Sequence, residues 1–288
     1  MELLILPFDH RASLLKKLFG VADRKPTREE MHKYAEMKKI IYDGFLQAIK
    51  EFDKNKAAIL VDEEFGYDIL IDAKKRNIIT IYTIEKSGQE EFDFEYEDWQ
   101  KHVKKIQPDY GKVLVRFNPS LDNSTQIKKL KKANDGLKEL KTKFLFELLV
   151  PGTEEQLSQG QEYYDEKIRP KLMVEAISQL QKSGIEPDVW KLEGVNSKKD
   201  AEKLVLQTKQ KKCEGIVILG RGQNKEAALK WVEIGAETKG VVGFAVGRTI
   251  FWDAIKGFNE GKMTRKQAVD LVCSNYLEFV KQWSKKHG

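Results

Sequence analysis

A lysine occupies the middle of a short apolar stretch, Pro187 to Gly194, whose sequence is PDVWKLEG. The bounding proline and glycine and the apolar residues between them predict a buried strand followed by a turn. Desolvating an ammonium group is costly, so a buried lysine needs either a partner or a chemical role. In an apolar site the pKa of a lysine falls, and its neutral amine can attack a carbonyl carbon. Lys191 is therefore a candidate Schiff-base nucleophile; the alternative is an ordinary lysine that faces solvent.

A carboxylate, Glu147, interrupts a second apolar run, which extends from Phe144 to Val150. Burial raises the pKa of a carboxyl group, and a raised pKa suits a general acid or base. We therefore expect a raised pKa for Glu147, with a structural carboxylate paired to a neighbouring lysine as the alternative. On adjacent strands, Glu147 and Lys191 would supply the proton transfer and the nucleophile of an aldolase.

Two similar turns, GRG at residues 220–222 and GRT at residues 247–249, each combine glycine with arginine. Backbone N–H groups and a guanidinium together suit a phosphate, and a helix over residues 251–257 would direct its N-terminus at the anion. The alternative is that both turns only close loops. The chain lacks GxGxxG and Walker patterns, which disfavours a nucleotide. The candidate phosphate-binding residues are Gly220, Arg221, Gly222, Gly247 and Arg248.

Eight apolar runs alternate with amphipathic stretches along the chain, and these elements must position the candidate residues. Thr27, Ser197 and Thr264 are expected helix N-caps. The alternation favours a single-domain (β/α)8 barrel over residues 1–288, with a doubly wound open sheet as the competing α/β fold. The expected strands are residues 3–6, 57–61, 78–82, 113–117, 144–148, 189–192, 215–219 and 243–246.

Active-site residues of such a barrel follow the carboxyl ends of its strands, and ionisable residues gather at this end of nearly every expected strand. His10 could be a base or a ligand, although a lone histidine beside a strand end is more often a hydrogen-bonding residue. The acidic residues 62–64 could hold a divalent ion, with a polar loop as the simpler interpretation. The candidate residues at the strand ends are Asp9, His10, Arg11, Lys86, Lys112 and Arg116.

Composition narrows the classes of protein and partner. The 288 residues include two cysteines, too few for a disulfide framework, so a reducing cytoplasm fits. His and Cys do not occur at metal-ligand spacings, and we expect neither a metal nor a cofactor. The net charge of +6 comes mostly from lysines without interleaved aromatic residues, which favours small anionic substrates over nucleic acid. A signal peptide and a membrane-spanning run are absent from the sequence, so no membrane association is expected.

Six motifs occur in the chain in a fixed order. They are PFDHR at residues 7–11, LVDEEFG at 60–66, EKSG at 85–88, FELLVP at 146–151, DVWKLEG at 188–194 and GRT at 247–249. Together they resemble class I, Schiff-base aldolases of the tagatose-1,6-bisphosphate aldolase type. The resemblance extends from Asp9 to Trp283. It is closest to the 2-deoxy-5-keto-gluconate-6-phosphate aldolase domain of myo-inositol breakdown, which is often fused behind a sugar kinase.

This resemblance implies a metal-free (β/α)8 barrel with an imine on Lys191, proton transfer by Glu147 and phosphate held by the two glycine–arginine turns. It also implies that Asp9 contacts substrate hydroxyls and that Lys86 lies in the site. Lys86, Arg116 and Arg11 are candidates to bind a carboxylate at the far end of the pocket. Lys112 or Lys86 could lower the pKa of the reactive amine. The sequence leaves the oligomeric state open, and a homo-oligomer is one possibility.

The expected reaction cleaves 2-deoxy-5-keto-gluconate 6-phosphate to dihydroxyacetone phosphate and malonate semialdehyde. His10 and residues 117–119 differ from the bisphosphate aldolases, which weighs against a hexose bisphosphate. The alternatives are an aldolase for tagatose 1,6-bisphosphate or sulfofructose phosphate, and a non-catalytic sensor of phosphosugars. Retention of both Lys191 and Glu147 argues against the sensor, because binding alone requires no imine.

Overall fold

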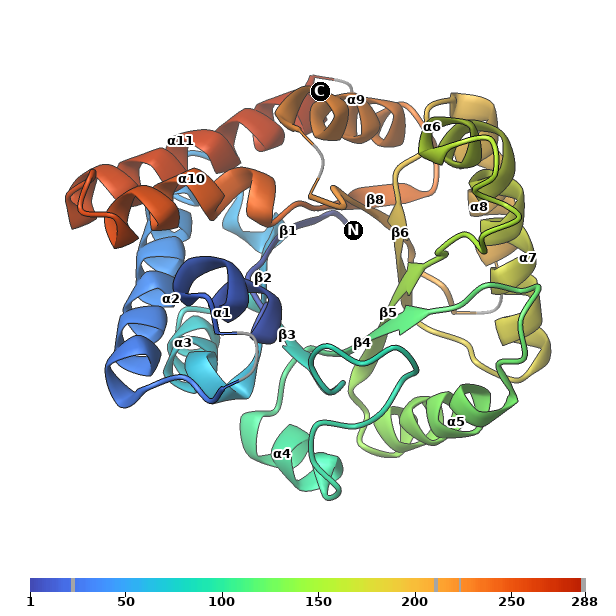
Figure 1. Cartoon of the computed structure of the whole chain (residues 1–288), viewed down its shortest axis with the longest axis horizontal. Coiled ribbons are helices and arrows are strands. Elements are labelled where there is room, and N and C mark those ends of the chain that lie inside the picture. The colour runs from blue at the N-terminus through green and yellow to red at the C-terminus, as the bar shows by residue number, and fades with distance from the viewer. Residues whose placement is uncertain (22–23, 210–211, 223, 286–288) are drawn as a thin grey trace.

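The computed structural model describes residues 1–21, 24–209, 212–222 and 224–285. Eight parallel strands follow one another in chain order around a closed barrel, and helices surround them (Figure 1). Pairing of the first strand with the last closes the barrel, which confirms the (β/α)8 prediction and excludes the open sheet. The strands are β1 (Leu3–Pro7), β2 (Ala57–Val61), β3 (Ile79–Thr83), β4 (Tyr110–Arg116), β5 (Lys143–Leu149), β6 (Val189–Glu193), β7 (Gly215–Leu219) and β8 (Val241–Ala245).

Three helices begin at the N-cap residues that the sequence predicted. The side chains of Thr27, Ser197 and Thr264 each accept a hydrogen bond from a backbone N–H in the first turn, so all three expected N-caps are confirmed. The helices are α1 (Ala12–Phe19), α2 (Arg28–Ala48), α3 (Glu63–Lys75), α4 (Trp99–Ile106), α5 (Ser124–Glu139), α6 (Gln161–Tyr163), α7 (Arg169–Lys182), α8 (Lys198–Thr208), α9 (Lys225–Ala236), α10 (Arg248–Asn259) and α11 (Arg265–Ser284). In the described part of the chain, no helix combines the length and the apolar character needed to cross a bilayer.

The strands read as apolar runs because both of their faces are buried, one inside the barrel and one beneath the helices. A glycine permits closure at the β1–β8 seam, since a Cβ atom on Gly243 would lie 1.8 Å from the carbonyl oxygen of Leu3. Strand β4 begins at Tyr110, three residues earlier than expected, because Gly111 and Lys112 are buried in the ladder despite their non-apolar character.

Alternation along the strands decides which side chains enter the barrel. Tyr110, Leu145 and Val189 belong to the apolar cluster that fills the interior. Residues two positions further along share their inward direction and lie one layer nearer the carboxyl ends of the strands. These residues are Lys112, Glu147 and Lys191.

Candidate active site

Two adjoining cavities open at the carboxyl ends of the strands. Their volumes are about 170 and 270 Å³, and both are lined by His10, Glu147 and Lys191. A larger cavity of about 430 Å³ lies among α1, α9, α10 and α11, but none of the buried lysines or carboxylates of the barrel lines it. The two smaller cavities therefore form the candidate active site.

The floor of this site is a cluster of two lysines and three carboxylates. The Nζ atom of Lys112 lies 2.8 Å from Asp9, 2.6 Å from Glu85 and 3.0 Å from Glu147. The same Glu147 oxygen lies 2.8 Å from the Nζ atom of Lys191. The strand register explains this second contact, because Glu147 on β5 pairs directly with Lys191 on β6. Glu147 thus joins the two ammonium groups.

Burial makes these contacts strong, since Lys191 is only 4% exposed and Lys112 only 1%. The raised pKa expected for Glu147 is wrong. Burial does raise the pKa of this carboxyl, but Lys112 and Lys191 outweigh burial and hold it below its ordinary value. Glu147 is accordingly a carboxylate at neutral pH, able to accept a proton.

Lys112 differs from Lys191 in the number of its partners. Burial lowers the pKa of Lys112, but the carboxylates of Asp9, Glu147 and Glu85 outweigh burial and raise it above its ordinary value. Burial likewise raises the pKa of Asp9, yet Lys112 and Lys191 bring it below the ordinary range of aspartate. Lys112 is thus a permanent cation, whereas Lys191 forms an ion pair with Glu147 alone among the described residues.

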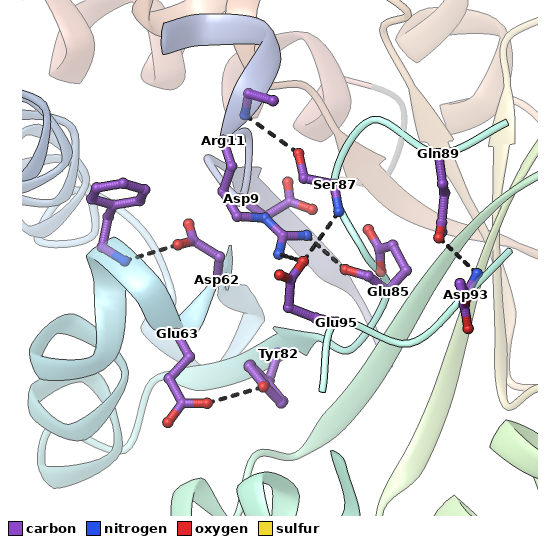
Figure 2. Close-up of polar contacts among 12 residues, drawn as sticks. Asp9, Arg11, Asp62, Glu63, Tyr82, Glu85, Ser87, Gln89, Asp93 and Glu95 are labelled. Carbon is purple, nitrogen blue, oxygen red and sulfur yellow. Dashed lines mark hydrogen bonds and ion pairs between the residues drawn. The ribbon is translucent and has the colours of Figure 1, made fainter. Parts of the chain in front are cut away.

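The predicted substrate-binding cations occupy different environments at the rim of the 170 Å³ cavity. Lys86 and Arg116 are exposed, and Arg116 donates a hydrogen bond to the carbonyl of Gln89 at 2.7 Å. Arg11 is buried, and its guanidinium already binds the carboxylate of Glu95 and the carbonyl of Glu85 (Figure 2). Arg11 therefore orders the loop around the cavity, and Lys86 and Arg116 present their charge to its mouth.

All five predicted phosphate-binding residues line the 270 Å³ cavity together with Lys191. Helix α10 starts at Arg248, earlier than the expected residue 251, so its first turn lies at this cavity. A Cβ atom on Gly247 would lie 2.4 Å from the carbonyl oxygen of Pro7, which explains the glycine before this helix. The positive end of a helix and a nearby guanidinium favour an anion.

The two arginines of these turns are not equivalent. Arg221 forms ion pairs with Asp165 at 2.6 Å and with Glu193 at 3.2 Å. Arg248 donates to the carbonyl of Arg221 at 3.3 Å, and within the described residues it has no carboxylate partner. Arg248 therefore carries the positive charge available to a phosphate, while the charge of Arg221 is already compensated.

His10 lines both cavities and packs edge-on against Phe251. Its Nδ1 atom is buried and has no hydrogen-bond partner in the described part of the chain. Burial, which the charge of Asp9 only partly offsets, lowers the pKa of His10 to about 4. His10 is thus a neutral imidazole in the wall of the site.

This neutral histidine predicts a pH-dependent stability. The folded pKa of His10 lies below its ordinary value of 6.5, so its contribution is complete above pH 6.5 and is lost as the pH falls towards 4. A tenfold change in a proton-binding constant corresponds to about 1.4 kcal/mol. Because His10 is partly exposed, we expect wild type to lose about 1–2 kcal/mol more than His10→Gln between pH 7.5 and 4.5. Denaturant unfolding at both values measures this difference. The exposed His32→Gln control should lose as much unfolding free energy between the two pH values as wild type. An equal loss in all three proteins would contradict the lowered pKa of His10.

The acidic residues 62–64 form neither an ion site nor a polar loop. Asp62 is buried, pairs with Lys38 and caps α3 by accepting the N–H of Phe65 at 2.9 Å (Figure 2). Glu63 follows in the first turn of α3 and contacts His102. Asp62 and Glu63 are thus paired with side chains of neighbouring elements. No group of His, Cys, Asp and Glu suited to a metal occurs among the residues that the structure describes.

Two contributions to the site do not follow from the sequence patterns above. Glu85 belongs to the EKSG motif without an expected role, yet it is buried on Lys112. The resemblance assigns the site residue of this motif to Lys86, the exposed neighbour of Glu85. The Asp165–Arg221 pair is also unexpected, since Asp165 lies on a short π-helical turn (Tyr164–Ile168) with no strand-end signal. Strand alternation is the signal for Glu85, which lies in phase with the inward-facing Ile81.

Comparison with known sequences places residues 1–287 in the family described as uncharacterized protein conserved in bacteria (DUF2090), and the chain belongs to this family. No curated protein sequence matches the chain.

Several solved aldolase structures resemble this fold. One is a fructose-bisphosphate aldolase from Plasmodium falciparum in complex with TRAP and a small-molecule inhibitor; the TM-score is 0.69 at 15% identity, over 98% of this chain and 90% of that one. A second is a Schiff base forming fructose-1,6-bisphosphate aldolase, with a TM-score of 0.59 at 13% identity over 95% of this chain and 92% of that one. A third is an archaeal fructose 1,6-bisphosphate aldolase, with a TM-score of 0.59 at 13% identity over 97% of this chain and 93% of that one. At these identities the similarity shows a shared barrel fold.

Proposed function

We propose that this member of the family is a class I aldolase that cleaves a phosphorylated ketose through an imine on Lys191. One observation carries the proposal. The buried amine of Lys191 lies 2.8 Å from a carboxylate and lines the same cavity as the two glycine–arginine turns. A protein that only binds phosphosugars needs no buried amine beside a proton acceptor, whereas imine chemistry requires both.

The first half of the reaction uses the contact between Lys191 and Glu147. Glu147 accepts a proton from the ammonium of Lys191, and the free amine attacks the ketone carbon. The resulting carbinolamine loses water when the same carboxyl returns a proton to the departing hydroxyl. An iminium ion then links the substrate to Lys191, and Glu147 is again a carboxylate. Its lowered pKa favours this return to the charged form.

The second half breaks the carbon–carbon bond. Glu147 takes the proton of the hydroxyl on the far side of that bond, the hydroxyl carbon becomes an aldehyde, and the bonding electrons move into the iminium to form an enamine. Protonation of the enamine and hydrolysis of the imine release the ketone half and restore Lys191. The permanent charge of Lys112, which touches three carboxylates, holds Glu147 and Asp9 in position and stabilises negative charge on the reacting oxygen.

The phosphate end fixes the substrate relative to Lys191. Arg248 and the first turn of α10 supply positive charge in the 270 Å³ cavity that Lys191 also lines. Binding energy from the phosphate, which does not react, orients the ketone for attack. The guanidinium of Arg221 is already paired with Asp165 and Glu193. In this proposal Arg221 therefore holds its turn in place and does not bind the phosphate with its charge.

For the substrate, we propose 2-deoxy-5-keto-gluconate 6-phosphate, which yields dihydroxyacetone phosphate and malonate semialdehyde. The motif resemblance supports this choice, and Lys86 and Arg116 at the mouth of the 170 Å³ cavity suit the terminal carboxylate. Tagatose 1,6-bisphosphate and sulfofructose phosphate also carry two anionic ends and are the competing substrates. Both Cys213 and Cys273 are free thiols, consistent with activity in a reducing cytoplasm.

Borohydride trapping tests the proposal. We expect wild type incubated with dihydroxyacetone phosphate and borohydride to gain one covalent adduct, which peptide mapping places on Lys191. The unphosphorylated ketone dihydroxyacetone, at the same concentration, should give far less adduct because it lacks the phosphate contact. Release of dihydroxyacetone phosphate from each of the three candidate substrates then ranks them. Absence of an adduct, or an adduct on Lys112, would refute the mechanism.

A further inference from the structure

Strand β4 presents three side chains to the site, ordered from its floor to its mouth. Lys112 is buried, Leu114 is partly buried and Arg116 is exposed. Strand alternation gives all three the inward direction of Tyr110, which belongs to the interior cluster. Residues two positions apart on a strand are separated by about 7 Å. The strand therefore places an apolar side chain between a cation at the floor and a second cation at the mouth.

Leu114 is the apolar part of the 170 Å³ cavity. Among the described residues that line this cavity it has the one apolar side chain, and the others are charged or polar, apart from Gly88. Leu114 also lines the 270 Å³ cavity, as Glu147 and Lys191 do. Its side chain therefore lies where the two cavities adjoin, and its partial exposure leaves it accessible to a bound molecule.

The strand register places Leu114 beside the proposed proton acceptor. Leu114 pairs directly with Glu147 of β5, and paired strands lie about 5 Å apart. In the proposed reaction Glu147 accepts the proton of the hydroxyl at the cleaved bond, and Arg116 binds the terminal anion. An aldehyde half held at these two points extends from the level of Glu147 on the strands to that of Arg116. The carbon between its two ends therefore lies against Leu114.

We propose that Leu114 determines which aldehyde half the site accepts, by selecting a methylene group on the carbon next to the aldehyde carbon. This inference rests on the proposed aldolase function. Leucine has neither a donor nor an acceptor in its side chain, so a hydroxyl directed at it loses its hydrogen bonds to water without replacement. The aldehyde half is then a short acid in which a methylene group separates the aldehyde from the anion.

This chemistry separates the three candidate substrates. The aldehyde half of 2-deoxy-5-keto-gluconate 6-phosphate is malonate semialdehyde, which has a methylene group at the carbon in question. The aldehyde halves of tagatose 1,6-bisphosphate and sulfofructose phosphate carry a hydroxyl there. Leu114 therefore favours the first substrate for a reason that does not depend on the motif resemblance.

A matched pair of aldehydes tests this role in the direction of condensation, the reverse of cleavage. Malonate semialdehyde and tartronate semialdehyde are both three-carbon aldehyde acids and differ by a single hydroxyl at the carbon next to the aldehyde. The loss of dihydroxyacetone phosphate with each aldehyde measures kcat/KM. We expect wild type to prefer malonate semialdehyde by about 10- to 100-fold, since an apolar pocket discriminates against an added hydroxyl to about this extent.

The variant Leu114→Asn has a side chain of similar size that can hydrogen-bond to the added hydroxyl, so the preference should fall to about threefold or less. Leu114→Met remains apolar and should keep the wild-type preference. Borohydride trapping of dihydroxyacetone phosphate, which lacks the aldehyde half, should stay within about twofold of wild type in both variants.

Two results would overturn the role of Leu114 while leaving the aldolase function in place. One is a wild type that condenses both aldehydes equally well, and the other is a Leu114→Asn variant that keeps the full preference. An equal loss with both aldehydes and in trapping would also overturn it, because Leu114 would then only pack the site. Failure of wild type to form an imine with dihydroxyacetone phosphate would instead refute the aldolase function, and this role with it.

Discussion

Replacing Lys191 with methionine should abolish cleavage and imine trapping while leaving the fold intact. Without the amine there is no electron sink for the breaking bond, and we expect kcat to fall by at least about ten-thousand-fold. Stability should change little, because Lys112 still lies 3.0 Å from the Glu147 carboxylate that loses Lys191. Methionine has a comparable length and suits a buried position. Steady-state kinetics, borohydride trapping and denaturant unfolding of the same preparation measure the three quantities.

The exposed Lys128→Met on α5 provides the control, with activity and stability equal to those of wild type. Residual cleavage by Lys191→Met above about one per cent of wild type would exclude the imine on this residue. If the variant still binds a phosphosugar and also preserves the biological effect of the protein, the non-catalytic sensor becomes the better explanation.

Replacing Lys112 with methionine should damage stability as well as activity. Three carboxylates, those of Asp9, Glu85 and Glu147, lose the ammonium that they share. Removing one side of a buried ion pair costs about 3–5 kcal/mol, because the remaining charge is buried and uncompensated. We also expect cleavage to fall at least about a hundredfold, since the cation that stabilises the reacting oxygen is lost. Comparison with Lys191→Met by denaturant unfolding at pH 7.5 isolates the stability effect.

The pH dependence of this loss follows from the directions of the pKa shifts. The pKa values of Asp9 and Glu147 are lowered in the wild-type fold, so their contribution is present at neutral pH and is lost on acidification below their ordinary pKa values near 4. The raised pKa of Lys112 means that its contribution persists below pH 10.5 and disappears only at more alkaline pH. In Lys112→Met, Lys191 is left to balance both carboxylates, so we expect burial to shift their pKa values upwards relative to wild type. The difference in unfolding free energy between Lys112→Met and wild type should therefore be smaller at pH 4.5 than at pH 7.5. A variant as stable as Lys191→Met at both values would show that Lys112 does not neutralise the cluster.

The sequence alone predicted the barrel, and it placed the candidate site at the carboxyl ends of the strands. Apolar runs buried on both faces, separated by capped helices, leave few architectures, and the expected strand over residues 189–192 lies within the observed β6. Alternation along that strand also directs Lys191 inward, in phase with Val189. These features depend on residues close together in the chain, which is why local patterns reveal them.

Tertiary structure alone decided which charges meet. Lys112 and Asp9, which are 103 positions apart, become partners through closure of the barrel, and Lys112 reverses the expected pKa shift of Glu147. The same closure occupies Arg221 with Asp165 and leaves one oxygen of Glu85 unpaired among the described residues. A side chain's type and strand position can be read from its neighbours in sequence. Its charge state and its availability to a substrate depend on atoms within a few ångströms of it, which the fold brings from distant parts of the chain.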